Sequence, residues 1–205
     1  MITSQLMTLS RFVCVTRSVT VGTTLLSSYH SRRYPPDPKI RVWEAALATC
    51  AASSFFDPIS IGRHKIEYVD GATGANNPVR YIWREAMDIW GSHNLDDRVD
   101  CLVSIGTGVP GARRFGDSVL EIARTLKEIA TDTQSTANEF HSEHSGMSTS
   151  GRYFRFNVQR GLEDIGLEQS DRMPEVAAAT SAYLEEEQAL LAAEGCARRL
   201  SMHSG

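Results

Sequence analysis

The most informative segment of this 205-residue chain runs Ile66-Glu67-Tyr68-Val69-Asp70-Gly71-Ala72-Thr73-Gly74-Ala75-Asn76-Asn77-Pro78. Its first residues, 66–69, predict a strand that delivers Asp70 directly into a glycine-rich turn. Asn77 is placed to cap a helix whose first residue is Pro78, since proline at that position loses no hydrogen bond. The segment therefore predicts a strand, a turn and a helix in succession, with Asp70 at the carboxyl end of the strand.

Strand-like and helix-like patterns alternate through the rest of the chain. Apolar runs predict strands over residues 12–16, 23–29, 99–105 and 153–158. A small-residue helix, predicted as buried, covers residues 40–52, and the helix from Pro78 carries an apolar stripe of Val79, Ile82, Trp83, Ala86 and Trp90 up to Gly91. Further helices are predicted from the capping box of Ser118 and Glu121 through Ala130, and from Pro174 toward Gly195. The polar residues 131–151 predict a loop or a frayed helix.

This alternation predicts an α/β fold with a mainly parallel sheet, in one domain without a dividing linker. Sites in such sheets gather at the carboxyl ends of the strands. Two strand ends carry special turns, Asp70-Gly71-Ala72 after Val69 and Gly106-Thr107-Gly108 after Ile105.

The amino-acid composition excludes several classes of protein. The chain is 41% hydrophobic and 22% charged, as expected of one soluble globular domain, and its net charge of −4 argues against a general nucleic-acid binder. No apolar run approaches the roughly 20 residues of a membrane span. The cysteines Cys14, Cys50, Cys101 and Cys196 form no C-x-x-C pair, so we expect free thiols in a reducing compartment, the cytosol, and no zinc site.

Three motifs in order carry a family resemblance. They are Val42-Trp43-Glu44-Ala45-Ala46 with Phe55-Phe56-Asp57-Pro58, Tyr68-Val69-Asp70-Gly71-Ala72 with Asn76-Asn77-Pro78, and Leu102-Val103-Ser104-Ile105-Gly106-Thr107-Gly108. Together with the segment 152–167 they resemble a patatin-like phospholipase domain, in particular its fungal branch related to calcium-independent phospholipase A2. The similarity spans residues 12–200 and leaves residues 1–11 as an unassigned N-terminal extension.

The resemblance implies a lipid acyl hydrolase on a three-layer α/β/α sandwich, with no metal or organic cofactor. Such enzymes use a Ser–Asp dyad, with the serine in a Gly-x-Ser-x-Gly turn and a glycine-rich loop as oxyanion hole. Asp70 would be the proton acceptor, and Gly71 and Ala72 complete its Asp-Gly-Ala motif. The implied partners are a lipid ester substrate or a membrane surface, which the protein would meet peripherally.

The serine half of the dyad is absent from the sequence. None of the 15 glycines starts a Gly-x-Ser-x-Gly motif, and there is no Gly-Gly-Gly run. Because the family carries both pieces before the Asp motif, we expect the chain to be the C-terminal portion of the domain, without its N-terminal strands, and inactive alone. The alternative is a non-catalytic remnant that serves as a lipid- or protein-binding module.

Each candidate residue also has a purely structural interpretation. Asp70 could serve only an Asx turn in which Gly71 supplies a positive φ. The pair His141 and His144, beside Glu139 and Glu143, is more typical of a polar surface than of a metal site. Gly106-Thr107-Gly108 suits a packing turn under the active site better than a phosphate cradle.

The first 43 residues are a basic outlier in an acidic chain. Their basic side chains could face anionic lipid, although scattered solvated charge is the simpler interpretation. They are Arg11, Arg17, Arg32, Arg33, Lys39 and Arg41.

Overall fold

The computed structural model describes residues 13–18, 22–33, 40–52, 56–91, 93–109, 120–163, 165–166 and 169–202. The chain divides into two compact units, Met1–Ile89 and Trp90–Gly205. Each unit is described by itself, and the expectation of one domain stays a prediction.

The first unit contains a four-stranded sheet in the order β2-β1-β4-β3, in which every pair is antiparallel. Three of its strands lie where the sequence predicts them, but the expected parallel direction is wrong for this sheet. Three residues join β1 to β2 and four join β3 to β4, and such short connections permit only antiparallel pairing. The strands are β1 (Val13–Ser18), β2 (Gly22–Ser27), β3 (Ile59–Ile61) and β4 (Ile66–Asp70).

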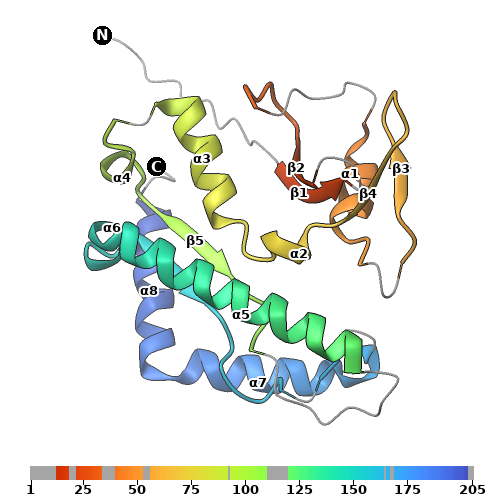
Figure 1. The fold of residues 1–205 in the computed structure, drawn as a ribbon. Helices are drawn as coiled ribbons and strands as arrows, with labels where there is room; N and C mark the ends of the chain where they lie inside the picture. The colour runs from red at the N-terminus through yellow and green to blue at the C-terminus, as the bar shows by residue number, and fades with distance from the viewer. Residues whose placement is uncertain are drawn as a thin grey trace. The chain divides into compact units, whose positions relative to one another are not determined.

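Helix α1 (Val42–Thr49) covers part of this sheet with one face only (Figure 1). Ala48 is fully buried in a cluster with Ile61 and Tyr68. The opposite face exposes large apolar side chains, among them Val42 at 85% and Trp43 at 53%. The sequence prediction of a buried helix is therefore right for the Ala48 face and wrong for the other.

The turn after β4 leads through the short helix α2 (Ala72–Ala75) into α3 (Val79–Trp90). The predicted apolar stripe of α3 is confirmed at Val79, Trp83 and Ala86, which are buried. Gly91 ends the helix with a φ of 88°, as predicted. The buried carboxylate of Glu85 accepts hydrogen bonds from Tyr29 (2.9 Å) and Ser31 (3.1 Å), which tie the segment after β2 to α3.

The second unit contains a parallel pair, β5 (Leu102–Ile105) and β6 (Tyr153–Phe156), in the register Leu102↔Tyr153. A helical crossover, α5 (Leu120–Glu143) and α6 (Ser145–Thr149), connects them, as parallel pairing requires. The prediction of a loop or frayed helix over 131–151 is therefore wrong for most of that segment. The remaining elements are α4 (Leu95–Arg98), η1 (Ser170–Arg172), α7 (Met173–Glu185) and α8 (Glu187–Ser201).

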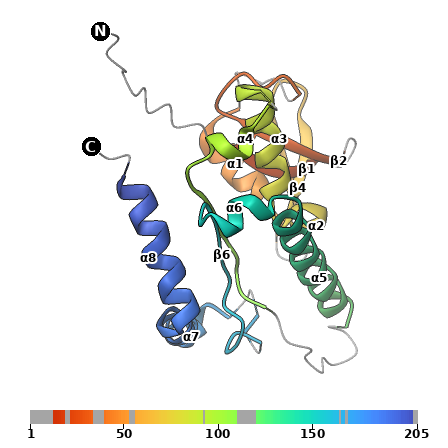
Figure 2. The same ribbon diagram turned by 90° about the vertical axis from the view of Figure 1, so that its left-hand side faces the viewer.

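The last predicted helix is two helices. Glu186 has an extended backbone, with ψ at 135°, and Figures 1 and 2 show α8 turning sharply away from α7 at that point. Gly195 lies inside α8 and does not end it. The capping box of Ser118 and Glu121, the stripe from Val119 to Ala130 and most of the predicted loop 32–39 lie outside the described residues or side chains.

Among the described residues, no helix has the length and apolar character that crossing a membrane requires.

The fully buried Thr16 generates a stability prediction. Its hydroxyl lies within hydrogen-bond distance of the carbonyls of Ala48 (3.1 Å) and Val69 (2.7 Å), so it links β1 to both α1 and β4. Thr16→Val keeps the shape and removes the donor, which should lower the free energy of unfolding by about 1–3 kcal/mol in urea denaturation. The matched control is Thr24→Val on the paired position of β2. Equal stability of the two variants would contradict the prediction.

Candidate functional site

Asp70 is the last residue of β4, and two elements fix its backbone. It pairs with Thr16 across the β1–β4 ladder. Its N–H donates to the carbonyl of Ala51 (2.8 Å), just beyond the end of α1. Its side chain is half-buried.

The Asp70 carboxylate makes the Asx turn that the sequence suggests. Its Oδ1 accepts a hydrogen bond from the N–H of Ala72 (2.8 Å). The other carboxylate oxygen, Oδ2, makes no hydrogen bond to any of the described residues. Burial raises the pKa of this carboxyl above its ordinary value, and the Ala72 N–H opposes part of that rise.

Position 71 requires glycine because there is no room for a side chain, and not because the backbone needs a positive φ. Its φ is −72°, so the expected positive φ is wrong. A Cβ at this position would lie 2.6 Å from the carbonyl oxygen of Val15 and 3.2 Å from the Cα of Thr16. Only glycine lets the turn pass this close to β1.

Asn77 and Pro78 behave nearly as predicted. Asn77 is buried, and its Oδ1 accepts from the N–H of Val79 at 3.3 Å. The helix begins at Val79, one residue after the predicted start. The Asp-Gly-Ala turn is thereby held between a strand and a capped helix.

The Gly106-Thr107-Gly108 turn is a packing turn within the second unit. The N–H of Gly108 donates to the Oδ1 of Asn157 (2.9 Å), and its φ of 93° favours glycine. A Cβ on Gly106 would overlap the side chains of Asn157 and Arg155. The placement under the active site stays a prediction.

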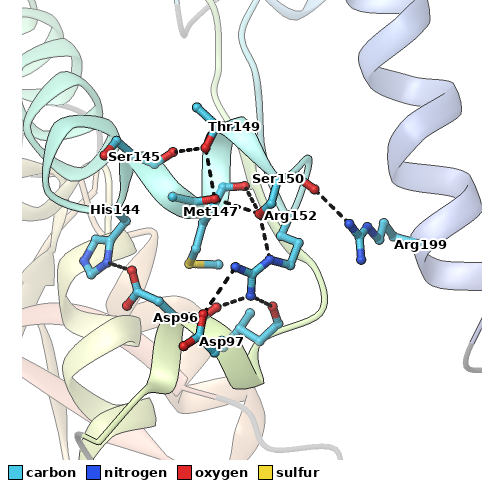
Figure 3. A network of polar contacts seen from close by, with 11 residues as sticks. Asp96, Asp97, His144, Ser145, Met147, Thr149, Ser150, Arg152 and Arg199 are labelled. Carbon is cyan, nitrogen blue, oxygen red and sulfur yellow. Dashed lines mark hydrogen bonds and ion pairs between the residues drawn. The ribbon is translucent and has the colours of Figure 1, made fainter.

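The two histidines bind separate partners. His144 Nδ1 lies 2.9 Å from a carboxylate oxygen of Asp96 (Figure 3). His141 Nδ1 lies 2.9 Å from Ser148 Oγ. The part of the chain that the structure describes holds no group of three or more metal-ligating side chains. His141 is exposed, whereas the His144 side chain is only 15% exposed, so the prediction of a polar surface describes His141 and not His144.

Arg152 organises a polar network that sequence reasoning missed (Figure 3). Its guanidinium donates to the carbonyls of Asp96 and Val99 and to Ser150 Oγ, and it thereby ties α4 to the residues before β6. No local pattern signals these contacts, because the α4 partners lie more than 50 positions away in the sequence.

Among the described basic residues of the N-terminal segment, none forms a hydrogen bond or an ion pair with Asp70. Arg17 is exposed, and Arg33 pairs with Asp88 at 2.5 Å. Arg11 and Lys39 lie outside the described residues.

Two comparisons with known proteins show what this chain is similar to. Residues 7–83, which include the Asp-Gly-Ala turn, match the family model described as patatin-like phospholipase. A protein of Arabidopsis thaliana named phospholipase A I is 33% identical over 176 residues. That match covers 80% of this chain and 13% of the plant protein, so the chain spans a small part of that relative.

The chain belongs to the patatin-like phospholipase family. The narrower placement in a fungal branch stays a prediction.

The close approach at Gly71 predicts a large effect of one methyl group. Gly71→Ala should lower the free energy of unfolding by about 1–3 kcal/mol, because backbone atoms of β1 must move to accept the Cβ. Gly146→Ala is the control, since a Cβ there meets no heavy atom within 4 Å and alanine favours the helix, so it should not lower the free energy of unfolding. Two equally stable variants in urea denaturation would disprove the close contact.

The raised pKa of Asp70 predicts a pH-dependent loss of stability. The native state holds this proton more tightly than the unfolded state, whose Asp pKa is about 3.9, so ionisation of Asp70 costs stability as the pH rises through the native pKa. Asp70→Asn keeps the oxygen for the Ala72 N–H and removes this cost. In urea denaturation, the free energy of unfolding of Asp70→Asn relative to the wild type should therefore increase from pH 4 to pH 7. Parallel profiles would contradict the raised pKa.

Proposed function

We propose that this chain supplies the proton-accepting aspartate of a lipid acyl hydrolase, and that Asp70 is that residue. The observation that carries the proposal is the Asp-Gly-Ala turn itself. It holds a half-buried carboxylate of raised pKa on a fixed backbone, inside the segment that matches the patatin-like family.

The proposed chemistry uses the carboxylate as a general base. Asp70 takes the proton from a serine hydroxyl while the serine oxygen attacks the ester carbonyl, and it gives that proton to the departing alcohol as the acyl-enzyme forms. It then takes a proton from the attacking water and returns it to the serine oxygen as the fatty acid leaves. An ordinary Asp, with a pKa of about 3.9, is a weak base at neutral pH. Burial that raises the pKa makes the carboxylate a better acceptor, and Oδ1 stays engaged by Ala72 while Oδ2 meets the serine.

The nucleophile and the oxyanion donors must come from outside these 205 residues. The sequence holds no Gly-x-Ser-x-Gly and no Gly-Gly-Gly run, so the chain alone should not hydrolyse lipid esters. We propose residues 12–200 as part of one patatin-like domain, built as an α/β/α sandwich. It would act on lipid esters at a membrane surface from the cytoplasmic side, without a cofactor.

One observation favours a different class of function, a non-catalytic lipid- or protein-binding module. The outer face of α1 exposes Val42, Trp43 and Leu47, and Phe56 is exposed a few residues further on. Large exposed apolar patches are typical of binding surfaces. This function needs no nucleophile.

A chimera separates the two functions. The aligned segment of this chain replaces its counterpart in the Arabidopsis phospholipase A I, and phospholipid hydrolysis is measured on vesicles. We expect an active chimera and no turnover by the isolated chain. Asp70→Asn in the chimera should lower kcat by about 10²–10⁴-fold, because it removes the base and keeps the turn.

The matched control is Asp57→Asn, which changes an exposed aspartate of the same unit and should leave kcat unchanged. An Asp70→Asn chimera with full activity would refute the catalytic role. A folded but inactive chimera that sediments with vesicles, and loses that binding on Trp43→Ser, would favour the binding module.

A further inference from the structure

Two thiols of the second unit meet although they lie far apart in the sequence. Cys101 directly precedes β5, and Cys196 lies in the second half of α8. Both are free cysteines, and Cys196 lies close enough to Cys101 to raise the pKa of its thiol. The sequence has no paired cysteine motif and predicts free thiols, which the structure shows for both, and the fold brings these two near each other.

Independent contacts hold both cysteines beside the start of β6. On the β5 side, the N–H of Leu102 donates to the carbonyl of Arg152 (2.7 Å). On the α8 side, Arg199 donates to the carbonyls of Ser150 (2.8 Å) and Gly151 (3.2 Å), as Figure 3 shows for Ser150. The thiol pair is thus fixed by the backbone around it.

Close packing of α8 on β6 adds to this placement. A Cβ on Gly195, the neighbour of Cys196, would lie 3.3 Å from a ring carbon of Phe154. A larger residue at position 195 would push α8 outward and carry Cys196 with it. The glycine therefore keeps the second thiol near the first.

The two thiols differ in access. Cys196 is buried, whereas Cys101 is partly exposed, so a reagent in solution reaches Cys101 first. Burial and the neighbouring Cys196 raise the pKa of Cys101 to about 11, with Asp100 adding to the rise and Arg199 opposing it. At neutral pH Cys101 is therefore mostly protonated and reacts slowly.

We propose that Cys101 and Cys196 are a modification site that closes to an intramolecular disulfide, linking α8 to the start of β5. The oxidant is a small-molecule disulfide such as oxidised glutathione. The Cys101 thiolate attacks one of its sulfurs and releases one glutathione thiolate, which leaves a mixed disulfide on Cys101. The Cys196 thiolate then attacks the Cys101 sulfur and releases the second glutathione thiolate.

The reaction balances within these partners. Two protein thiols lose two electrons and two protons, and one glutathione disulfide gains both to become two thiols. The crosslink closes a long loop that contains the whole β5–α5–α6–β6 crossover, so it should stabilise the second unit. The site is independent of the proposed lipid hydrolysis.

The test treats the full chain with oxidised glutathione at pH 8 and maps its peptides by mass spectrometry without reduction. We expect one crosslinked pair containing Cys101 and Cys196, a rise in the melting temperature and reversal of both by dithiothreitol. Because the pKa of Cys101 is about 11, the initial rate should rise about tenfold from pH 7 to pH 8.

Matched variants make the result specific. Cys50→Ser, at an exposed cysteine of the first unit, should leave the crosslink and the melting shift intact. Cys101→Ser and Cys196→Ala should each abolish both, with far-UV circular dichroism to verify folding. A lasting mixed disulfide on Cys101 of the wild type, or a crosslink through Cys14 or Cys50, would overturn the proposal.

Discussion

The close approach between the carbonyl of Val15 and Gly71 is the constraint on which the first unit depends. The same carbonyl oxygen accepts a hydrogen bond from the hydroxyl of Thr49 at 2.5 Å. One backbone oxygen of β1 therefore contacts both the last residue of α1 and the Asp-Gly turn. The next residue, Thr16, uses its hydroxyl to link α1 and β4. Two residues of β1 therefore fix the end of the strand, the start of the turn and the orientation of Asp70.

Local patterns predicted the strand end, the Asx turn and the helix start around Asp70, because these features are encoded within a few residues. The reason for Gly71 was mispredicted, because it lies in the distant Val15. Pro78 and Asn77 marked the helix start, and the side-chain spacing marked its buried face. For 131–143 the polar residues left a loop and a frayed helix open, and the structure shows a regular helix there. Side-chain pairs one helical turn apart, such as Gln134 with Asn138 (2.9 Å), suit a polar helix instead.

Features that depend on distant partners left no local signal. The antiparallel direction of β1 with β2 and of β3 with β4 followed from their short connections. The length of a connection is known only when the ends of both strands are known, and the sequence pattern does not fix those ends. The Arg152 network joins residues more than 50 positions apart, and the Cys101–Cys196 pair forms only because α8 packs on β6. Similarly, an alanine-rich pattern predicts that a helix approaches its neighbour closely, but it does not say that one face only is covered, as in α1.

The turn and the proposed catalytic role of Asp70 are compatible, because they use different atoms. The Asx turn engages Oδ1, and it fixes both the plane and the direction of the carboxylate. A base that acts by direct contact gains from such fixing, since the proton acceptor must lie within about 3 Å of the attacking hydroxyl. β1 and the end of α1 already engage the backbone of Asp70, so a serine must approach on the Oδ2 side of the carboxylate. The rigid turn therefore limits the nucleophile to one side of Asp70, which is a stronger geometric demand than the Asp-Gly-Ala motif alone imposes.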